Sequence, residues 1–277
     1  MRRTVTASSL TMEWKMDSSG LTLEGISVHF GGLAALTDVS LRVPPRRVVG
    51  VIGPNGAGKS TLFNVICGLL RPDSGRLLMD GRVLRRLRPH QLTRLGIART
   101  LQDVGLFDGL SVWENVVAGA TNQASAGFAT ALFGLPASER DERRLRDHAR
   151  AVLDELDLAS YVDAQPRSLP YAIRKRVALA RALAARPRLL LLDEPAGGLG
   201  PDEVRELGAL IESLPRRADH PCSVLLVEHH MDLVMGVCDD IVVLNFGQVI
   251  TSGGPEQVGN DPRVAEAYLG VAAEKAA

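Results

Sequence analysis

One run in the sequence has residue types and spacing that suit the binding of phosphate groups. Residues 53–60 read Gly-Pro-Asn-Gly-Ala-Gly-Lys-Ser and match the pattern G-x-x-x-x-G-K-[ST]. The glycines let successive backbone N–H groups point at phosphate oxygens, and a following helix adds the positive end of its dipole. In such a loop Lys59 reaches the β- and γ-phosphates, and the Ser60 hydroxyl is a ligand of Mg²⁺. An apolar run precedes the loop and a helical run, Thr61–Leu70, follows it, which favours a phosphate site over a chance glycine-rich turn.

A second chemical pattern is a pair of carboxylates that directly follows an apolar run. Leu189–Leu192 is followed by Asp193 and Glu194. In phosphate-loop enzymes an aspartate in this place holds the Mg²⁺ shell. The neighbouring glutamate is suited to polarise an attacking water as a general base. The two patterns together predict a site that hydrolyses a nucleoside triphosphate.

Four short apolar runs would position these groups, and each of them indicates a strand. They are Val48–Ile52, Leu189–Leu192, Val224–Val227 and Ile241–Leu244. Runs this short and this apolar are typical of strands covered on both faces, as in a parallel sheet. Helical stretches with apolar stripes separate them, for example over residues 204–214.

Two kinds of region depart from this alternation. Residues 22–47 and 76–84 indicate antiparallel strands joined by glycine-containing turns, and residues 103–186, approximately, are mostly helical. We therefore predict an α/β fold of the P-loop NTPase (RecA-like) type. Its core is a parallel sheet, to which an antiparallel β subdomain and an inserted helical subdomain are added.

The composition narrows the classes of protein that fit. The chain has 277 residues, and its 32 basic residues balance 32 acidic ones, which argues against a dedicated nucleic-acid binder. Its three cysteines are too few and too scattered for a disulfide framework or a zinc site, so we expect small buried thiols. No apolar run is long enough for a membrane span, and the serine-containing start lacks the apolar core of a secretory signal. We expect residues 1–20 to be a flexible leader and residues 271–277 a C-terminal tail.

With these landmarks in this order, the chain resembles the ATP-binding cassette (ABC) family over residues 21–270, which would form one ATP-binding domain. Phe30, placed 23 residues before Gly53, matches the aromatic residue that stacks on adenine in that family. Gln102 matches the glutamine of its Q-loop, and His229, in Val-Glu-His-His, matches its switch histidine. The alternatives are a core aromatic for Phe30, an ordinary loop residue for Gln102 and a surface histidine for His229.

The resemblance implies a full set of site residues. The residues expected to contact ATP are Phe30, Gly53, Pro54, Asn55, Gly56, Ala57, Gly58, Lys59, Ser60 and Thr61. Those expected to hold Mg²⁺ are Ser60, Gln102 and Asp193, and those expected to be catalytic are Glu194, His229 and Gln102.

Within the family, the chain is most similar to the ATPase subunits of branched-chain amino acid importers. Phe-Gly-Gly-Leu at residues 30–33, Leu-Pro-Tyr at 169–171 and the ending Ala-Tyr-Leu-Gly at 267–270 are all of that kind. Urea and amide importers share these traits. The resemblance implies transmembrane permease partners, a second ABC ATPase subunit, a periplasmic or extracellular solute-binding protein, and a location on the cytoplasmic face of the membrane.

The chain departs from the family pattern at positions whose residues, in that family, approach the nucleotide bound by the partner subunit. The signature, usually Leu-Ser-Gly-Gly-Gln, is Leu-Pro-Tyr-Ala-Ile here. Ala172 adds a Cβ, which would penalise a positive φ by roughly 1 kcal/mol or more, and Ile173 removes an amide side chain. Gly200 replaces a common Asp or Asn in the D-loop. Because the motifs for the chain's own nucleotide are intact, we expect a heterodimer with a cassette that has a normal signature.

One further segment and several alternatives remain open at this point. Asp103–Asn115 would either form a docking groove for a cytoplasmic helix of a permease or belong to the helical core. A cluster of arginines over residues 82–94 indicates a solvated basic face rather than a nucleic-acid site, since no aromatic residues interleave with them. A soluble ABC-type ATPase and an ATP-gated regulator with weak hydrolysis remain alternatives. A P-loop kinase or GTPase does not account for Gln102 and His229 together.

Overall fold

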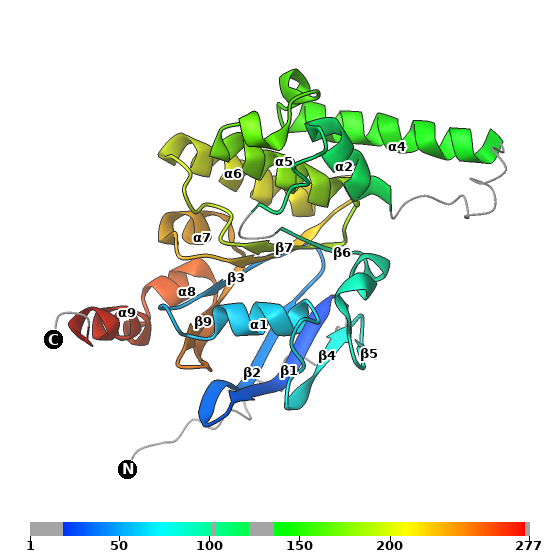
Figure 1. The fold of residues 1–277 in the computed structure, drawn as a ribbon. Coiled ribbons are helices and arrows are strands. Elements are labelled where there is room, and N and C mark those ends of the chain that lie inside the picture. Colours follow the sequence, from blue (N-terminus) through cyan, green and yellow to red (C-terminus); the bar gives the residue numbers. More distant parts are fainter. Residues whose placement is uncertain (1–18, 101–103, 122–135, 275–277) are drawn as a thin grey trace, which may run out of the picture.

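A six-stranded sheet made of the apolar runs lies at the centre of the computed structural model, which describes residues 19–100, 104–121 and 136–274 (Figure 1). The strand order is β10-β9-β3-β8-β7-β6, in which only the β10–β9 pair is antiparallel. The strands are β3 (Val48–Ile52), β6 (Ile97–Arg99), β7 (Leu189–Asp193), β8 (Ser223–Val227), β9 (Asp240–Asn245) and β10 (Gln248–Gly253).

The strands of this sheet are apolar throughout because both faces of the sheet are covered. Leu190 and Leu192 of β7 belong to one core cluster, which they share with helices of the helical region. Leu189 and Leu191 belong to a second cluster on the opposite face. Since successive side chains of a strand point to opposite faces, both sets must be apolar.

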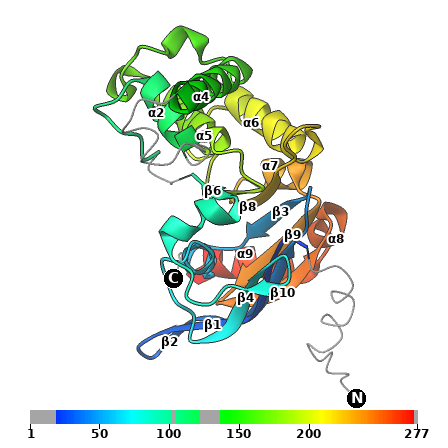
Figure 2. The ribbon, with the colours of Figure 1, turned by 90° about the vertical axis from the view of Figure 1, so that its right-hand side faces the viewer.

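The second core cluster joins this sheet to an antiparallel sheet of order β2-β1-β4-β5. Its strands are β1 (Leu21–Phe30), β2 (Leu33–Val43), β4 (Ser74–Met79) and β5 (Arg82–Val83). Helix α1 (Lys59–Ile66) contributes Leu62 and Phe63 to the same cluster, so it packs between the two sheets (Figures 1 and 2).

Helix α1 is shorter than the helical run expected from the sequence. It ends at Ile66 rather than at Leu70. Cys67 is the C-cap, and Gly68 follows with φ +67°, in the left-handed region that ends many helices. The N–H groups of Leu69 and Leu70 both donate to the carbonyl oxygen of Asn64, so the chain turns there.

The helical region packs over one end of the central sheet and appears at the top of Figure 1. It contains α2 (Val112–Ala120), α4 (Pro136–Glu155) and α5 (Tyr171–Ala184), with short 3₁₀ turns at Ala159–Tyr161 and Pro166–Ser168. The fully buried Asn115 fixes the loop before α2, because its Nδ2 donates to the carbonyl oxygens of Phe107, Leu110 and Ser111.

The remaining helices follow the strands of the second half of the chain. They are α6 (Pro201–Ser213), α7 (Met231–Val237), α8 (Pro255–Gly259) and α9 (Pro262–Glu274), and further 3₁₀ turns lie at Pro89–Gln91, Thr93–Leu95 and Leu214–Arg216. Among the described residues, no helix combines the length and the apolar character needed to cross a membrane.

The predicted fold class is confirmed, together with the four predicted strands of the core. The sequence reasoning missed two strands at the edges of the central sheet, β6 and β10. The proposed domain boundaries stay predictions, and residues 1–18 of the expected leader and 275–277 of the expected tail lie outside the described residues. The three cysteines are buried and free, as expected.

Candidate functional site

The phosphate loop connects β3 to α1 and has the shape that its glycines predict. Gly58 caps the helix with φ +100°, and a Cβ there would lie 2.7 Å from the carbonyl oxygen of Ala35 in β2. The loop is also tied to the turn between β9 and β10, because Gly247 donates its N–H to the carbonyl oxygen of Ala57 at 3.0 Å. Gly247 in turn accepts a hydrogen bond from the N–H of Thr37 at 2.8 Å. Both sheets therefore hold the loop in place.

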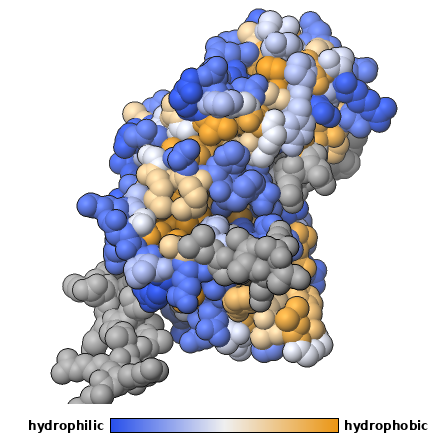
Figure 3. All heavy atoms as spheres, turned by 90° about the vertical axis from the view of Figure 1, so that its left-hand side faces the viewer, coloured by the Kyte–Doolittle hydropathy of each residue, from blue (hydrophilic) through white to orange (hydrophobic). Residues whose placement is uncertain are grey.

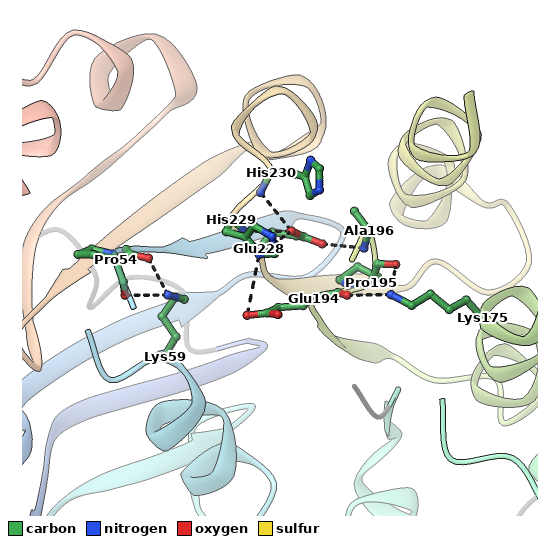
Figure 4. A network of polar contacts seen from close by, with 10 residues as sticks. Pro54, Lys59, Lys175, Glu194, Pro195, Ala196, Glu228, His229 and His230 are labelled. Carbon is green, nitrogen blue, oxygen red and sulfur yellow. Dashed lines mark hydrogen bonds and ion pairs between the residues drawn. The ribbon is translucent and has the colours of Figure 1, made fainter. Parts of the chain in front are cut away.

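Lys59 is the first residue of α1 and is almost fully buried, with 8% of its surface exposed. Its Nζ donates to the carbonyl oxygens of Gly53 and Pro54 at 2.6 and 2.9 Å (Figure 4). Burial lowers the pKa of Lys59, and the carboxylates of Glu194 and Asp193 oppose that shift. Lys59 is therefore close enough to Asp193 and Glu194 for their charges to interact, as the sequence patterns predict.

Asp193 ends β7 and stands opposite Val227 of β8. Burial raises the pKa of its carboxyl group, and the neighbouring Glu194 carboxylate adds to this shift. The guanidinium of Arg99 and the ammonium of Lys59 act in the other direction. A partly buried carboxylate beside cations is a suitable oxygen ligand for a hard ion such as Mg²⁺.

Glu194 has an unusual backbone conformation. Its φ is +46°, in the left-handed region, which costs a non-glycine residue roughly 1–2 kcal/mol. Its N–H donates to the carbonyl oxygen of Val227 at 2.8 Å. Strain of this kind persists only where surrounding contacts fix the residue, and it is concentrated at functional sites.

His229 lies beside Glu194, at the carboxyl end of β8. Its Nδ1 is 3.9 Å from Oε1 of Glu194 and 3.7 Å from Oε2 of Glu228, and about half of its side chain is exposed. His230 is the N-cap of α7 and is also exposed. The structure therefore brings Lys59, Asp193, Glu194 and His229 together at the carboxyl ends of the central strands β3, β7 and β8.

Two residues of this site were missed by the sequence reasoning, Glu228 and Lys175. Glu228 is fully buried and accepts backbone hydrogen bonds from Ala196, His229 and His230 (Figure 4). Lys175 of α5 donates to the carbonyl oxygens of Glu194 and Pro195. The charge of Glu228 directly after an apolar strand was the only available signal, and nothing in the sequence pairs Lys175 with this loop.

Several other residues that we expect at the nucleotide site have exposed side chains or backbone, and one of the expected residues lies outside the described part of the chain. Phe30 ends β1 with 52% of its surface exposed, so the alternative of a core aromatic is wrong. Leu33, across the hairpin from Phe30, is 67% exposed, and apolar side chains reach the surface at several places in Figure 3. Asn55, Gly56 and Ser60 are exposed along the phosphate loop. Gln102 lies outside the described residues.

The signature-position segment does not carry the strain expected from the sequence. Helix α5 begins at Tyr171, so Ala172 has right-handed helical backbone and no positive φ for its Cβ to penalise. That part of the expectation was wrong. Ile173 is partly buried and packs against the helical core. Gly200 has an ordinary φ of −75° as the N-cap of α6, and its N–H donates to Oε2 of Glu203.

The residues present fit a triphosphate and a magnesium ion. A glycine-rich backbone leads into a helix N-terminus that has no acidic residue in its first turn, which suits polyphosphate oxygens. The Ser60 hydroxyl and the Asp193 carboxylate are oxygen donors of the type that Mg²⁺ prefers. Lys59 supplies a buried positive charge in the field of Asp193 and Glu194.

Comparisons with known proteins agree with this geometry. The family model described as ABC transporter matches residues 36–197, and the model described as branched-chain amino acid ATP-binding cassette transporter matches residues 248–274. The chain is 41% identical to the high-affinity branched-chain amino acid transport ATP-binding protein BraF of Pseudomonas aeruginosa, over 91% of this chain and 98% of that protein. It is 39% identical to the corresponding protein LivG of Escherichia coli, with the same coverage.

A more distant relative and two solved structures complete the comparison. The lipopolysaccharide export system ATP-binding protein LptB of Acidithiobacillus ferridurans is 37% identical, over 84% of this chain and 89% of that protein. A nucleotide-free ATP-binding cassette from an ABC transporter superimposes with a TM-score of 0.77 at 30% identity, covering 90% of this chain and 98% of that one. The ADP conformation of MJ1267, an ATP-binding cassette of an ABC transporter, gives a TM-score of 0.76 at 30% identity, covering 91% of this chain and 98% of that one.

Proposed function

Since the chain belongs to the ABC transporter family and is one of its ATPases, we propose that it powers an importer for branched-chain or other small amino acids or amides. The observation that carries the proposal is the joint match to BraF and to the C-terminal model of branched-chain amino acid cassettes. The match to BraF extends over nearly all of that protein, and the C-terminal model matches residues 248–274, which the general ABC transporter model does not match.

In the proposed binding step, the phosphate loop wraps the phosphates of ATP. Backbone N–H groups of the loop and the ammonium of Lys59 offset the negative charge, and Phe30 stacks on the adenine. Ser60, Asp193 and Gln102 are the residues that would hold Mg²⁺, which when bound supplies further charge compensation on the phosphate oxygens.

In the proposed chemical step, Glu194 accepts a proton from the attacking water, and His229 contacts the γ-phosphate. General bases of this kind contribute about 10²–10⁴-fold in rate. The 3.9 Å between His229 Nδ1 and Glu194 Oε1 supports a shared task, because both side chains point into the same space (Figure 4).

The proposal extends to the assembly. Two cassettes face each other, and each ATP lies between one chain's phosphate loop and the other's signature segment. Closing and opening of this pair moves the permease subunits between two states by rigid-body rotation. The chain would lie on the cytoplasmic face of the membrane through these permeases, with a solute-binding protein on the other side.

Uptake into proteoliposomes tests the transported solute. The transporter, assembled with its permease subunits, second cassette and solute-binding protein, is loaded with Mg-ATP and offered radiolabelled leucine, with unlabelled valine, acetamide or urea as competitors. We expect ATP-dependent leucine uptake that valine suppresses. Competition only by acetamide or urea would assign the amide class instead, and ATP hydrolysis without any uptake would favour a regulator.

A further inference from the structure

Glu228 is a buried carboxylate whose hydrogen bonds join two segments of the catalytic site. Its side chain has no exposed surface. Oε1 accepts the N–H of Ala196 at 2.7 Å, and Oε2 accepts the N–H groups of His229 and His230 at 2.9 and 3.2 Å. Burying a carboxylate is costly unless it is hydrogen-bonded, and such charge-assisted bonds are roughly twice as strong as neutral ones. The segment after Glu194 and the segment of His229 are therefore held at a fixed separation.

Lys175 holds the same segment from the opposite side. It lies on α5, the helix that begins with the signature-position residues. Its Nζ donates to the carbonyl oxygens of Glu194 and Pro195 at 3.1 and 2.9 Å (Figure 4). Burial lowers the pKa of Lys175, and the carboxylates of Glu228 and Glu194 oppose that shift, so the ammonium is partly desolvated and lies in the field of both carboxylates.

The two charged side chains bind the backbone of residues 194–196, one through an N–H group and the other through carbonyl oxygens. Glu228 binds the N–H of Ala196, and Lys175 binds the carbonyl oxygens of the two preceding residues. Within this stretch Glu194 has its left-handed φ of +46°, which costs a non-glycine residue roughly 1–2 kcal/mol. These contacts restrain the backbone that follows the Glu194 Cα, and the hydrogen bond from the Glu194 N–H to Val227 restrains the backbone before it.

We propose that Glu228 and Lys175 are positioning residues for ATP hydrolysis. Glu228 keeps Glu194 and His229 at one separation, and Lys175 makes the position of Glu194 depend on α5. The proposal rests on the general-base role proposed above for Glu194. Since the start of α5 would face the nucleotide of the partner subunit, Lys175 links the state of that site to the catalytic glutamate of this one.

The first experiment replaces Lys175 in the full-length chain within the assembled transporter. Lys175→Met keeps the apolar stem and removes the donor, Lys175→Arg keeps a charged donor, and Arg176→Met is the matched control on the same helix. Arg176 pairs with the exposed Glu206 instead of the catalytic loop. ATP affinity is measured by calorimetry and hydrolysis in a single turnover.

For Lys175→Met we expect an ATP Kd within about twofold of wild type and hydrolysis at least about tenfold slower, since charge-assisted bonds are lost. Lys175→Arg should recover most of the rate, and Arg176→Met should hydrolyse ATP like wild type. Wild-type hydrolysis by Lys175→Met, or an equal loss in Arg176→Met, would overturn the role of Lys175.

A double-mutant cycle separates positioning from general stabilisation. If Lys175 acts through Glu194, adding Lys175→Met to Glu194→Gln should slow hydrolysis by less than about twofold, because the two residues act as one unit. If Lys175→Met slows hydrolysis equally in the wild-type chain and in the Glu194→Gln chain, the positioning role of Lys175 is contradicted, while the general-base role of Glu194 is unaffected. A Glu194→Gln chain with wild-type turnover would contradict the general-base role itself, and with it the proposal that depends on it.

Glu228→Gln tests the other half of the proposal, with Glu206→Gln as the matched control on the exposed face of α6. In glutamine an NH2 donor replaces one of the two carboxylate oxygens, so on one side a donor faces the backbone N–H that the carboxylate accepted. We expect slower hydrolysis at an unchanged ATP Kd in Glu228→Gln and wild-type values in Glu206→Gln. Thermal unfolding of each variant identifies any loss of fold, and a folded Glu228→Gln chain that hydrolyses ATP normally would refute the role of Glu228.

Discussion

Lys59 is the residue on which nucleotide affinity should depend most. It is nearly buried, and its ammonium lies against the phosphate loop. Lys59→Ala should weaken Mg-ATP binding by about tenfold or more, because charge-assisted hydrogen bonds contribute about 1.5–3 kcal/mol each. Calorimetry on the purified chain measures this directly. Phe30→Ala is the comparison, with a smaller loss expected from an exposed stacking residue, and equal ATP affinity in Lys59→Ala and wild type would exclude the assignment.

Glu194 should affect turnover and leave binding intact. Glu194→Gln keeps the shape of the side chain and removes the base, so we expect normal ATP affinity with turnover reduced by about 10²–10⁴-fold. The variant should also accumulate the closed pair of cassettes when ATP is added. Phosphate release and gel filtration with ATP measure the two effects. Normal turnover in the assembled transporter would show that another group takes the proton.

Individual residues of the site differ in how far a sequence can predict them. The phosphate loop and the acidic pair are local patterns, so residue spacing alone indicated Lys59, Asp193 and Glu194. Lys175 reaches carbonyl oxygens 19 and 20 residues further along the chain, and Glu228 accepts an N–H from a residue 32 positions before it. These contacts depend on how α5 and the end of β8 pack beside the end of β7. No pattern within a short window contains that relation.

At the scale of elements, the segment before α2 offers a contact surface. Val104 is buried, but Phe107 is 54% exposed, with the guanidinium of Arg181 above its ring at 5.4 Å. A docking site for a permease helix is therefore favoured over core packing at Phe107. Phe107→Glu should abolish transport and leave the isolated chain folded, which uptake and thermal unfolding measure. A variant that unfolds would favour a packing role instead.

Elements were predictable where they are long or uniformly apolar. Strand β6 was missed because it has only three residues, Ile97–Arg99, and a run that short carries no periodicity. Strand β10 was missed because its exposure is mixed at the edge of the sheet. The end of α1 was placed too late because the apolar residues after Gly68 continue the helical pattern, and only the left-handed φ of that glycine stops it.

At the scale of the whole molecule, the altered signature segment predicts an unequal pair of sites. This chain's own phosphate loop, Glu194 and His229 are intact, whereas Ile173 and Gly200 lack the usual polar side chains. In a heterodimer with a normal cassette, Glu194→Gln here should remove nearly all turnover, and the equivalent change in the partner should remove little. Equal losses would refute the asymmetry. Fast hydrolysis by this chain alone would refute the need for a second type of cassette.

The burial of the three cysteines gives the native chain its own chemical reporter of opening. Burial raises the pKa values of Cys222 and Cys238 to about 12, so neither forms the thiolate that alkylating reagents attack. Iodoacetamide at neutral pH should therefore label these thiols only when the structure opens, at a rate that mass spectrometry can follow for each site. Because folding suppresses their ionisation, unfolding releases protons between their ordinary pKa and about 12, and stability should fall as the pH rises through that interval. Prompt labelling of the native chain, or a flat alkaline stability profile, would contradict this protection.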